Sequence, residues 1–339
     1  MRINFLSYTF DNRDGYGRHA KFMLRSLHRL GVSAQPIHLD QLSWDGWVQR
    51  LAGLDFSYLT FSIMSAGEFV GIPGRQWGLS MYECAKPPEG WADKINEHLE
   101  RFIVPSEWLV DVFRKAGVRK TLPIHVIGEG IDPLEVPFLD RRHRSKDRPF
   151  TFLSLGDRGG RKGHDLVWSA FHKAFNIDND NARLVIKCRA NNLPNLDLTL
   201  NPSWKWLSLW REDVPTMADV YEQVDAFIYP TRGEGWGLPA REAAATGLPV
   251  LATNWSGTAV NIDKWGIPLD QFKLVPSSLE TRGLWAEPSI DEIAEKMRWI
   301  YDHQDEAYAI GRRASEWLHA NETWDHATRD LIALLEKWG

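Results

Sequence analysis

The amino-acid sequence predicts an α/β protein of two doubly wound domains, and three observations support this. The chain has 339 residues, more than one domain usually needs. Short apolar segments with strand character alternate with helix-period segments in two separate series, as in parallel sheets covered by helices. Residues 132–148 between the series contain two prolines and a basic run, typical of a solvated linker. We therefore expect two Rossmann-like domains that face each other across a cleft.

The individual elements follow from periodicity and from the residues that bound each segment. In the first series we expect strands at 2–8, 32–38, 56–61, 76–82, 101–104 and 124–127, and helices at 18–30, 91–99 and 107–116. In the second we expect strands at 150–155, 184–187, 226–229 and 249–252, with helices at 165–175, 216–223 and directly after Pro239. The C-terminus is helical, ending with 324–338. The domain boundaries are accordingly 1–140 and 149–323.

One segment of the second series is more informative than the rest of the chain. Two carboxylates, Glu234 and Glu242, are eight positions apart around a GWGLP turn that feeds an alanine-rich helix. Pro239 suits the first helical turn, where its missing N–H group costs nothing. Glu234 thus lies at the carboxyl end of a strand, and Glu242 faces the same crevice from the helix. In open α/β sheets this crevice is where ligands bind.

The chemistry of this segment suits a sugar nucleotide. A helix N-terminus with free backbone N–H groups stabilises a phosphate. A carboxylate accepts hydrogen bonds from two neighbouring hydroxyls, so that one glutamate can hold a hexose and the other a ribose. Gly235 and Gly237 let the backbone approach the ligand closely. The alternative is a strand–turn–helix unit whose glutamates are only solvated.

The same segment resembles the E-x7-E signature of the retaining GT-B glycosyltransferases of family 4, usually EGFGLPxxEAMAxGxPV, with Trp236 in place of the usual Phe. The resemblance implies the GT-B fold. It implies that Glu234 contacts hydroxyls of the donor sugar and Glu242 the ribose, and that the donor site includes Gly235, Trp236, Gly237 and Leu238. It also implies that the last helix, about 324–339, packs back on the N-terminal domain.

Two further motifs resemble donor-binding segments of the family. Gly15 and Gly17 follow the first strand, like the family's glycine loop, although a plain tight turn explains them equally well. Arg161 and Lys162 precede a helix where relatives place cations on the donor diphosphate. Many relatives have Gly-Arg where this chain has Gly-Asp at 156–157, so that Arg158 or Arg161 takes the role of that arginine.

Two other positions carry open alternatives. Glu83 follows an apolar strand where many family members have a His that contacts the transferred sugar, and a subset has Glu. It either touches donor or acceptor or forms a buried salt bridge. Trp210 and Arg211 lie in the region where relatives hold the nucleobase, and either stack on or hydrogen-bond a base. Their alternative is an ordinary core Trp and a surface Arg.

The sequence therefore predicts a retaining glycosyltransferase that moves a hexose from a UDP- or GDP-sugar to a hydroxyl acceptor such as a glycan or glycolipid. Glu234, Arg161, Lys162 and Glu83 are the expected catalytic residues, and no cofactor or divalent metal is expected. One alternative is a GT-B sugar-nucleotide epimerase, which turns over the donor without an acceptor. The other is a non-catalytic subunit that binds a nucleotide sugar.

Composition limits the partners and the compartment. The net charge of −5 shows no basic excess, so nucleic acid is not an expected partner. Cys84 and Cys188 have neither metal-ligand nor disulfide spacing, which favours a reducing cytoplasm. The helix at 18–30 carries a stripe of four basic residues, which is read as a solvated face. A peripheral contact with the inner face of a membrane is the alternative.

Overall fold

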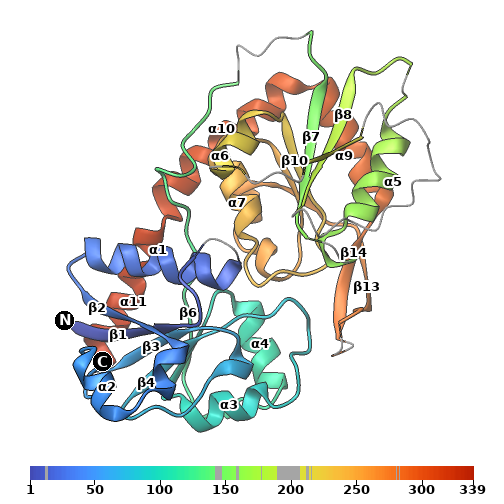
Figure 1. Ribbon diagram of the computed structural model, residues 1–339. Helices are drawn as coiled ribbons and strands as arrows, with labels where there is room; N and C mark the ends of the chain where they lie inside the picture. The colour runs from blue at the N-terminus through green and yellow to red at the C-terminus, as the bar shows by residue number, and fades with distance from the viewer. Residues whose placement is uncertain are drawn as a thin grey trace. The chain divides into compact units, whose positions relative to one another are not determined.

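The computed structural model describes residues 1–11, 14–141, 147–157, 160–176, 178–188, 207–210, 214, 216–279, 281 and 283–339. The chain divides into two compact units (Figure 1). Unit 1 holds Met1–Gly130, Leu279–Gly283 and Glu322–Gly339, and unit 2 holds Ile131–Ser278 and Leu284–Asn321. Within the described residues, no helix is both long and apolar enough to cross a bilayer.

In its described part, unit 1 is built on a parallel sheet with the strand order β2-β1-β3-β4-β5-β6. Its strands are β1 (Arg2–Ser7), β2 (Ser33–His38), β3 (Thr60–Ile63), β4 (Gln76–Leu79), β5 (Arg101–Val104) and β6 (Ile124–Val126). Its helices are α1 (Gly15–Arg29), α2 (Gly46–Leu51), α3 (Trp91–His98), α4 (Glu107–Lys115) and α11 (Trp324–Trp338).

Both faces of this sheet are covered. One buried cluster joins β1 and β3 to α1 and to α11, and the other joins β5 to α3 and α4. The indole of Trp324 stacks on the ring of Phe22, with centroids 5.9 Å apart. The last helix of the chain is thus part of the core of unit 1.

The described part of unit 2 contains a second parallel sheet, in the order β12-β11-β10-β7-β8-β9. Its strands are β7 (Phe150–Leu155), β8 (Ala182–Lys187), β9 (Leu207–Trp210), β10 (Ala226–Tyr229), β11 (Val250–Thr253) and β12 (Ile267–Leu269). An antiparallel pair, β13 (Phe272–Pro276) and β14 (Leu284–Pro288), lies outside the sheet. Its helices are α5 (His164–Ala174), α6 (Met217–Glu222), α7 (Leu238–Ala245), α8 (Ile262–Trp265), α9 (Ile290–Asp302) and α10 (Gln304–Asn321).

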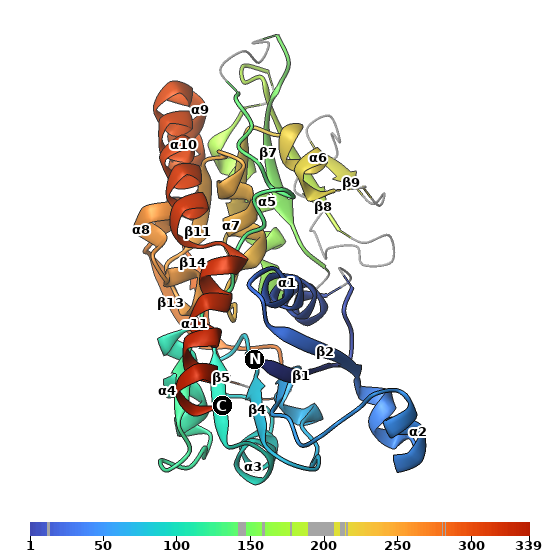
Figure 2. The same ribbon diagram turned by 90° about the vertical axis from the view of Figure 1, so that its left-hand side faces the viewer.

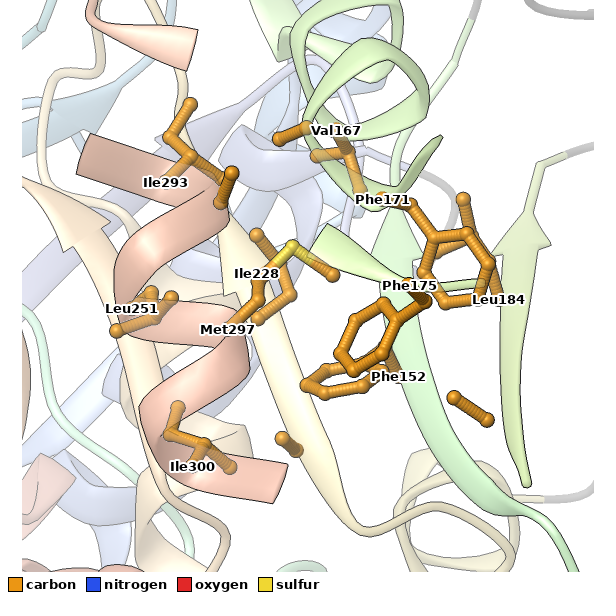
Figure 3. Packing of buried hydrophobic residues seen from close by; sticks show 14 of the residues in the cluster. Phe152, Val167, Phe171, Phe175, Leu184, Ile228, Leu251, Ile293, Met297 and Ile300 are labelled. Carbon is orange, nitrogen blue, oxygen red and sulfur yellow. The ribbon is translucent and has the colours of Figure 1, made fainter. Parts of the chain in front are cut away.

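Consecutive residues of each central strand of unit 2 point to opposite faces of the sheet. Phe152 and Ile228 face α5 and α9, where they pack against Phe171 and Met297 (Figure 3). The residues next to them in the two strands face the other way, toward α7, α8 and α10. Figure 2 shows α10 along this second layer, beside α7 and α8. Burial on both faces explains why these strands read as continuous apolar runs.

The expected fold class is confirmed, since two parallel sheets are each covered by helices on both faces. The strand expected at 56–61 was wrong in its position, because β3 begins only at Thr60. The Asp55 carboxylate accepts a hydrogen bond from the Ser57 N–H group at 3.0 Å, which holds that segment in a turn. The first helix begins at Gly15 rather than 18, because the Asp14 side chain caps the Gly17 N–H group at 2.8 Å.

Candidate functional site

The turn between β10 and α7 carries the candidate site of unit 2. Strand β10 ends at Tyr229, and α7 begins at Leu238 with Pro239 in its first turn, as predicted. Gly237 is the N-cap, with a φ of +92° that favours glycine. The turn from Glu234 to Gly237 is buried, although it connects a strand to a helix.

Two cations meet the first carboxylate of the motif. Arg161 and Lys162 belong to a single 3-10 turn, Gly160–Lys162, directly before α5. Arg161 Nη1 and Lys162 Nζ each lie 2.8 Å from Glu234 Oε1. Arg161 also donates a hydrogen bond to the carbonyl oxygen of Gly233 at 2.9 Å. Three residues that the sequence analysis singled out separately therefore form one charged cluster.

The electrostatics of the cluster keep Glu234 ionised. Burial raises the pKa of its carboxyl, but the charges and hydrogen bonds of Arg161 and Lys162 outweigh burial and hold this pKa below its usual range. The exposed fractions are 8% for the Glu234 side chain, 24% for Arg161 and 16% for Lys162. Both cations are thus held in place and partly open to solvent, which suits an incoming anion.

Tyr229 completes the cluster, although no motif of the sequence had marked it as a site residue. Lys162 Nζ donates a hydrogen bond to the Tyr229 hydroxyl at 3.1 Å, and the ammonium lies 5.3 Å from the centre of the ring. Burial, and then the charge of Glu234, raise the pKa of Tyr229 well above its ordinary value, so that the hydroxyl keeps its proton. A tyrosine at the carboxyl end of a central strand is the signal that could have found it.

Arg232 was also missed, and it holds the cationic turn in place. Its guanidinium donates to both carboxylate oxygens of Asp165, at 3.0 and 2.7 Å, and to Glu287 Oε2 at 3.1 and 3.0 Å. It also donates to the carbonyl oxygen of Gly160. Arg232 therefore ties the start of α5 and the turn before it to β14.

His164 fixes the loop on the other side of this turn. Its Nδ1 lies 2.8 Å from the Ser154 hydroxyl, and its Nε2 lies 3.1 Å from the carbonyl oxygen of Gly156. Because a carbonyl only accepts, Nε2 carries a proton, and Nδ1 then accepts from Ser154. Burial lowers the pKa of His164, which favours this neutral form.

The other predicted residues of unit 2 lie in different surroundings. Glu242 is buried in α7, one turn after its start, and Trp236 is buried in the turn before this helix. Trp210 ends the edge strand β9, with the ammonium of Lys187 5.2 Å from its ring centre. Arg158 and Arg211 lie outside the residues that the structure describes.

The predicted residues of unit 1 gather at the carboxyl ends of its strands. Gly15 and Gly17 open α1, and the residue between them, Tyr16, reaches the end of β4. The Tyr16 hydroxyl donates to the carbonyl oxygen of Met81 at 2.8 Å and lies 3.1 Å from the Ser80 hydroxyl. Burial, then the charge of Glu83, raise the pKa of Tyr16. The glycine loop and the half-buried Glu83 thus belong to one region of unit 1.

The described part of the chain contains no preformed site for a metal ion. No three or more His, Cys, Asp or Glu side chains there are grouped so that they could hold an ion.

Comparison with known proteins assigns the chain to a family. Residues 136–317, more than half of the chain, match the family described as glycosyl transferases group 1, and the protein therefore belongs to it. Among solved structures, the sucrose-phosphate synthase of Thermosynechococcus elongatus has a TM-score of 0.74 at 14% identity, with 99% of this chain and 98% of that chain covered. Anabaena HepE in complex with UDP and glucose has a TM-score of 0.72 at 13% identity, with 99% and 100% covered. At such identities the likeness concerns the fold, which is that of the GT-B glycosyltransferases.

Relatives identified by sequence match shorter stretches. The D-inositol 3-phosphate glycosyltransferase of Jonesia denitrificans is 34% identical over 129 residues, 37% of this chain and 26% of its own length. A GDP-mannose-dependent phosphatidylinositol monomannoside mannosyltransferase of Mycobacterium tuberculosis is 30% identical over 120 residues, 33% of this chain and 27% of its own. A protein of the Sulfolobus islandicus filamentous virus, named as a glycosyltransferase, is 24% identical over 209 residues, 60% of this chain and 56% of its own. The chain thus spans less than two thirds of the length of these relatives.

Proposed function

We propose that this protein is a retaining glycosyltransferase that moves a hexose from a UDP- or GDP-sugar to a hydroxyl acceptor such as a glycan or glycolipid. The observation that carries the proposal is the cluster in which Arg161 and Lys162 meet Glu234 at 2.8 Å. Two held cations suit the diphosphate of a donor, and a neighbouring carboxylate suits the hydroxyls of its sugar. Membership of the glycosyl transferases group 1 supports this reaction class.

In the proposed reaction the anomeric C–O bond of the donor breaks, and its electron pair leaves with the nucleoside diphosphate. The acceptor hydroxyl oxygen forms the new bond on the same face, and its proton passes to the leaving phosphate oxygen. Arg161 and Lys162 stabilise the charge that develops on the diphosphate. Preorganised donors of this kind contribute about 2.7–4 kcal/mol each to the transition state. Glu242 would hold the ribose, and Glu83 would contact the transferred sugar or the acceptor from unit 1.

The nucleotide that we propose for the donor is taken from the names of similar proteins. Anabaena HepE was solved with UDP and with UDP-glucose, and the Mycobacterium relative is named as GDP-mannose-dependent. We therefore propose a UDP- or GDP-sugar and test it by thermal shift against UDP-, GDP-, ADP- and dTDP-sugars. A donor at a hundred times its dissociation constant stabilises the protein by about 2.7 kcal/mol. A shift with one nucleotide, lost in Glu242→Ala, supports the donor site.

Product analysis separates the proposed function from its alternatives. A transferase releases nucleoside diphosphate and forms a new glycoside whose anomeric configuration matches that of the donor. An epimerase instead converts the donor without an acceptor, and a non-catalytic subunit binds it without turnover. Inverted product would overturn the retaining mechanism, and binding of none of these donors would overturn the transferase.

For localisation we propose the cytoplasm, with a peripheral membrane contact when the acceptor is a lipid. The two cysteines of the chain, Cys84 and Cys188, have neither disulfide nor metal-ligand spacing in the sequence, which suits a reducing compartment. On unit 1, α2 exposes 60% of Trp47 and 78% of Leu51, side chains that suit a membrane interface. Cell fractionation tests the compartment, and co-sedimentation with lipid vesicles, lost in a Trp47→Ser variant, tests the contact.

A further inference from the structure

The arginine of the motif, Arg241, is almost completely buried. It lies in α7 directly before Glu242, and its exposed fraction is 1%. Burying a guanidinium is costly unless its N–H groups and its charge are compensated. The contacts of Arg241 therefore indicate what this side chain does for the fold around it.

The guanidinium of Arg241 joins two loops. It donates to the carbonyl oxygen of Trp236 in the motif turn. It also donates to the carbonyl oxygens of Gly257 at 3.3 Å and Val260 at 2.8 Å, which belong to the loop between β11 and α8. One planar side chain thus bridges the backbone on both sides, which the fork of donors on arginine permits.

Two indole rings enclose the same guanidinium. Its central carbon lies 3.9 Å from the ring centre of Trp236 and 4.6 Å from that of Trp265. The Trp265 N–H group donates to the carbonyl oxygen of Val260 at 2.8 Å, so that it shares an acceptor with Arg241. The rings restrict the plane of the guanidinium and, with it, the direction of its hydrogen bonds.

The Ser256–Val260 loop that Arg241 reaches also holds the backbone of Glu234, the carboxylate residue of the charged cluster. The Glu234 N–H group donates to the Ser256 hydroxyl at 3.1 Å, and the Gly257 N–H group donates to the carbonyl oxygen of Glu234 at 3.0 Å. A shift of the Ser256–Val260 segment would therefore move the backbone of Glu234. Arg241 bonds to the same two segments, at Trp236 in the motif turn and at Gly257 and Val260 in the second loop.

We propose that Arg241, held between Trp236 and Trp265, is a positioning residue of the donor site. It acts through the motif turn: it fixes the backbone N–H groups from Gly235 to Leu238 and the carboxylate of Glu234 in the geometry that receives the sugar diphosphate. This inference rests on the proposed function for its kinetic consequence. Its structural consequence, an ordered turn, does not depend on which donor the protein uses.

Two variants and one control test the proposal. Arg241→Met removes all the donors while keeping a long side chain, and Arg241→Lys keeps the charge but loses the planar fork. The control is Arg298→Met on α9, whose guanidinium is 39% exposed and forms ion pairs with Asp180 and Asp302. Hydrogen exchange of the folded proteins, and kcat and KM for the donor, are measured in parallel.

We expect Arg241→Met to raise exchange in peptides that cover 234–238 and 256–260, and to lower kcat/KM by at least tenfold. The loss should fall on both kcat and the donor KM, and Arg241→Lys should restore part of it. Arg298→Met should leave both readouts unchanged. A residue with only a general stabilising role would lower the melting temperature and leave kcat and KM of the folded enzyme as they were.

The outcomes separate this inference from the proposed function. Unchanged exchange and unchanged kinetics in Arg241→Lys and Arg241→Met would overturn the inference while leaving the transferase intact. If the wild-type protein transferred no sugar from any donor, the proposed function would fall. The exchange measurement would then still decide whether Arg241 orders the motif turn. If Arg241→Met does not fold, Arg241→Lys carries the test.

Discussion

Glu234 shows how closely stability and the proposed chemistry are linked at the level of single residues. Its carboxylate offsets the charges of Arg161 and Lys162 in the absence of a donor. A donor diphosphate would bring a second anion to the same two cations. Glu234 would then be released toward the hydroxyls of the sugar, so that one carboxylate serves both states.

For Glu234→Gln we expect loss of transfer and a moderate loss of stability. The amide keeps the size of the side chain but removes the charge that both cations contact. Charge-assisted hydrogen bonds of this kind contribute about 1.5–3 kcal/mol, and the partial exposure of both cations puts the stability loss at the low end of that range. Transfer should fall by about 10²-fold or more. Denaturant unfolding and single-turnover assays measure the two effects.

The matched variant is Glu242→Ala, which should mainly weaken donor binding. Removing the proposed ribose partner should lower donor affinity by about 1.5–3 kcal/mol, with a smaller effect on the transfer step. Calorimetric titration with the donor measures the affinity. Near-wild-type transfer in both glutamate variants would contradict the assignment of the site.

Tyr229→Phe tests the residue that the sequence analysis missed. The substitution removes only the hydroxyl that accepts from Lys162, so that the ring and its packing remain. We expect donor binding to weaken by about 0.5–1.5 kcal/mol, the usual contribution of one hydrogen bond, with little change in the melting temperature. An increase in affinity would show that the hydroxyl restrains Lys162 rather than positions it.

The buried imidazole of His164 should make the free energy of unfolding depend on pH. Because burial lowers its pKa in the folded state below the ordinary 6.5, the unfolded chain binds a proton more readily. Its contribution to the free energy of unfolding is complete above about pH 6.5 and is lost as the pH falls through the folded pKa. Denaturant unfolding from pH 8 to pH 5 measures this loss. The difference between the wild type and His164→Gln should shrink with falling pH, and a constant difference would contradict the prediction.

At the scale of elements, the last carbonyl oxygen of α7 is bound by side chains of α10. The Ala245 carbonyl oxygen accepts from the Ser315 hydroxyl and lies 3.1 Å from Nε2 of His319. Gly311 lies one turn earlier on the same face of α10, where a Cβ would overlap the backbone carbonyl of Gly247. The helix with both motif residues Glu242 and Arg241 is therefore braced at its carboxyl end by a helix about 70 residues later in the chain.

Gly311→Ala should accordingly destabilise unit 2, although alanine is the better helix former. In an unhindered helix the substitution would stabilise by about 0.8–1.0 kcal/mol. Here the added methyl group forces α10 away from the end of α7, at a cost of about 1–3 kcal/mol. Thermal unfolding should show a lower melting temperature, with the exposed neighbour Arg312→Ala as the control. A higher melting temperature would show that α10 packs less closely on α7.

The same scale shows which elements the sequence could predict. The inner strands of both central sheets were found because burial on two faces produces short apolar runs between turn residues. The turn of the motif was found because Gly237 and Pro239 mark a helix start. Strands β9, β12, β13 and β14 were not placed, since short edge strands of mixed polarity carry little periodic signal.

Prediction of the site was limited in a similar way. The glutamates and cations could be singled out from the sequence because each lies in a contiguous motif. Tyr229, Arg232 and Arg241 act through contacts between segments far apart in sequence, or through burial of a charge that usually stays exposed. Local pattern could not show that a charged residue in an alanine-rich helix would lie between two indoles.

At the scale of the whole molecule, unit 1 is built from segments near both ends of the chain. The chain forms unit 1, continues through unit 2 and returns to unit 1 with α11. The returning helix buries Trp324, Leu331 and Leu335 against the first core. The two ends of the chain therefore stabilise the same unit, and a defect in α11 should act on residues more than 300 positions away.

Leu331→Ala tests whether that effect stays within unit 1. Its side chain is fully buried, so the substitution should cost about 2–5 kcal/mol. Hydrogen exchange should increase in peptides from 1–130 and remain unchanged in those from 149–278, because the lost contacts belong to the core of unit 1. Glu336→Ala, an exposed change on the same helix, should alter neither set. Equal loss of protection in both sets of peptides would mean that the two units unfold as one cooperative body, and α11 would then stabilise unit 2 as well as unit 1.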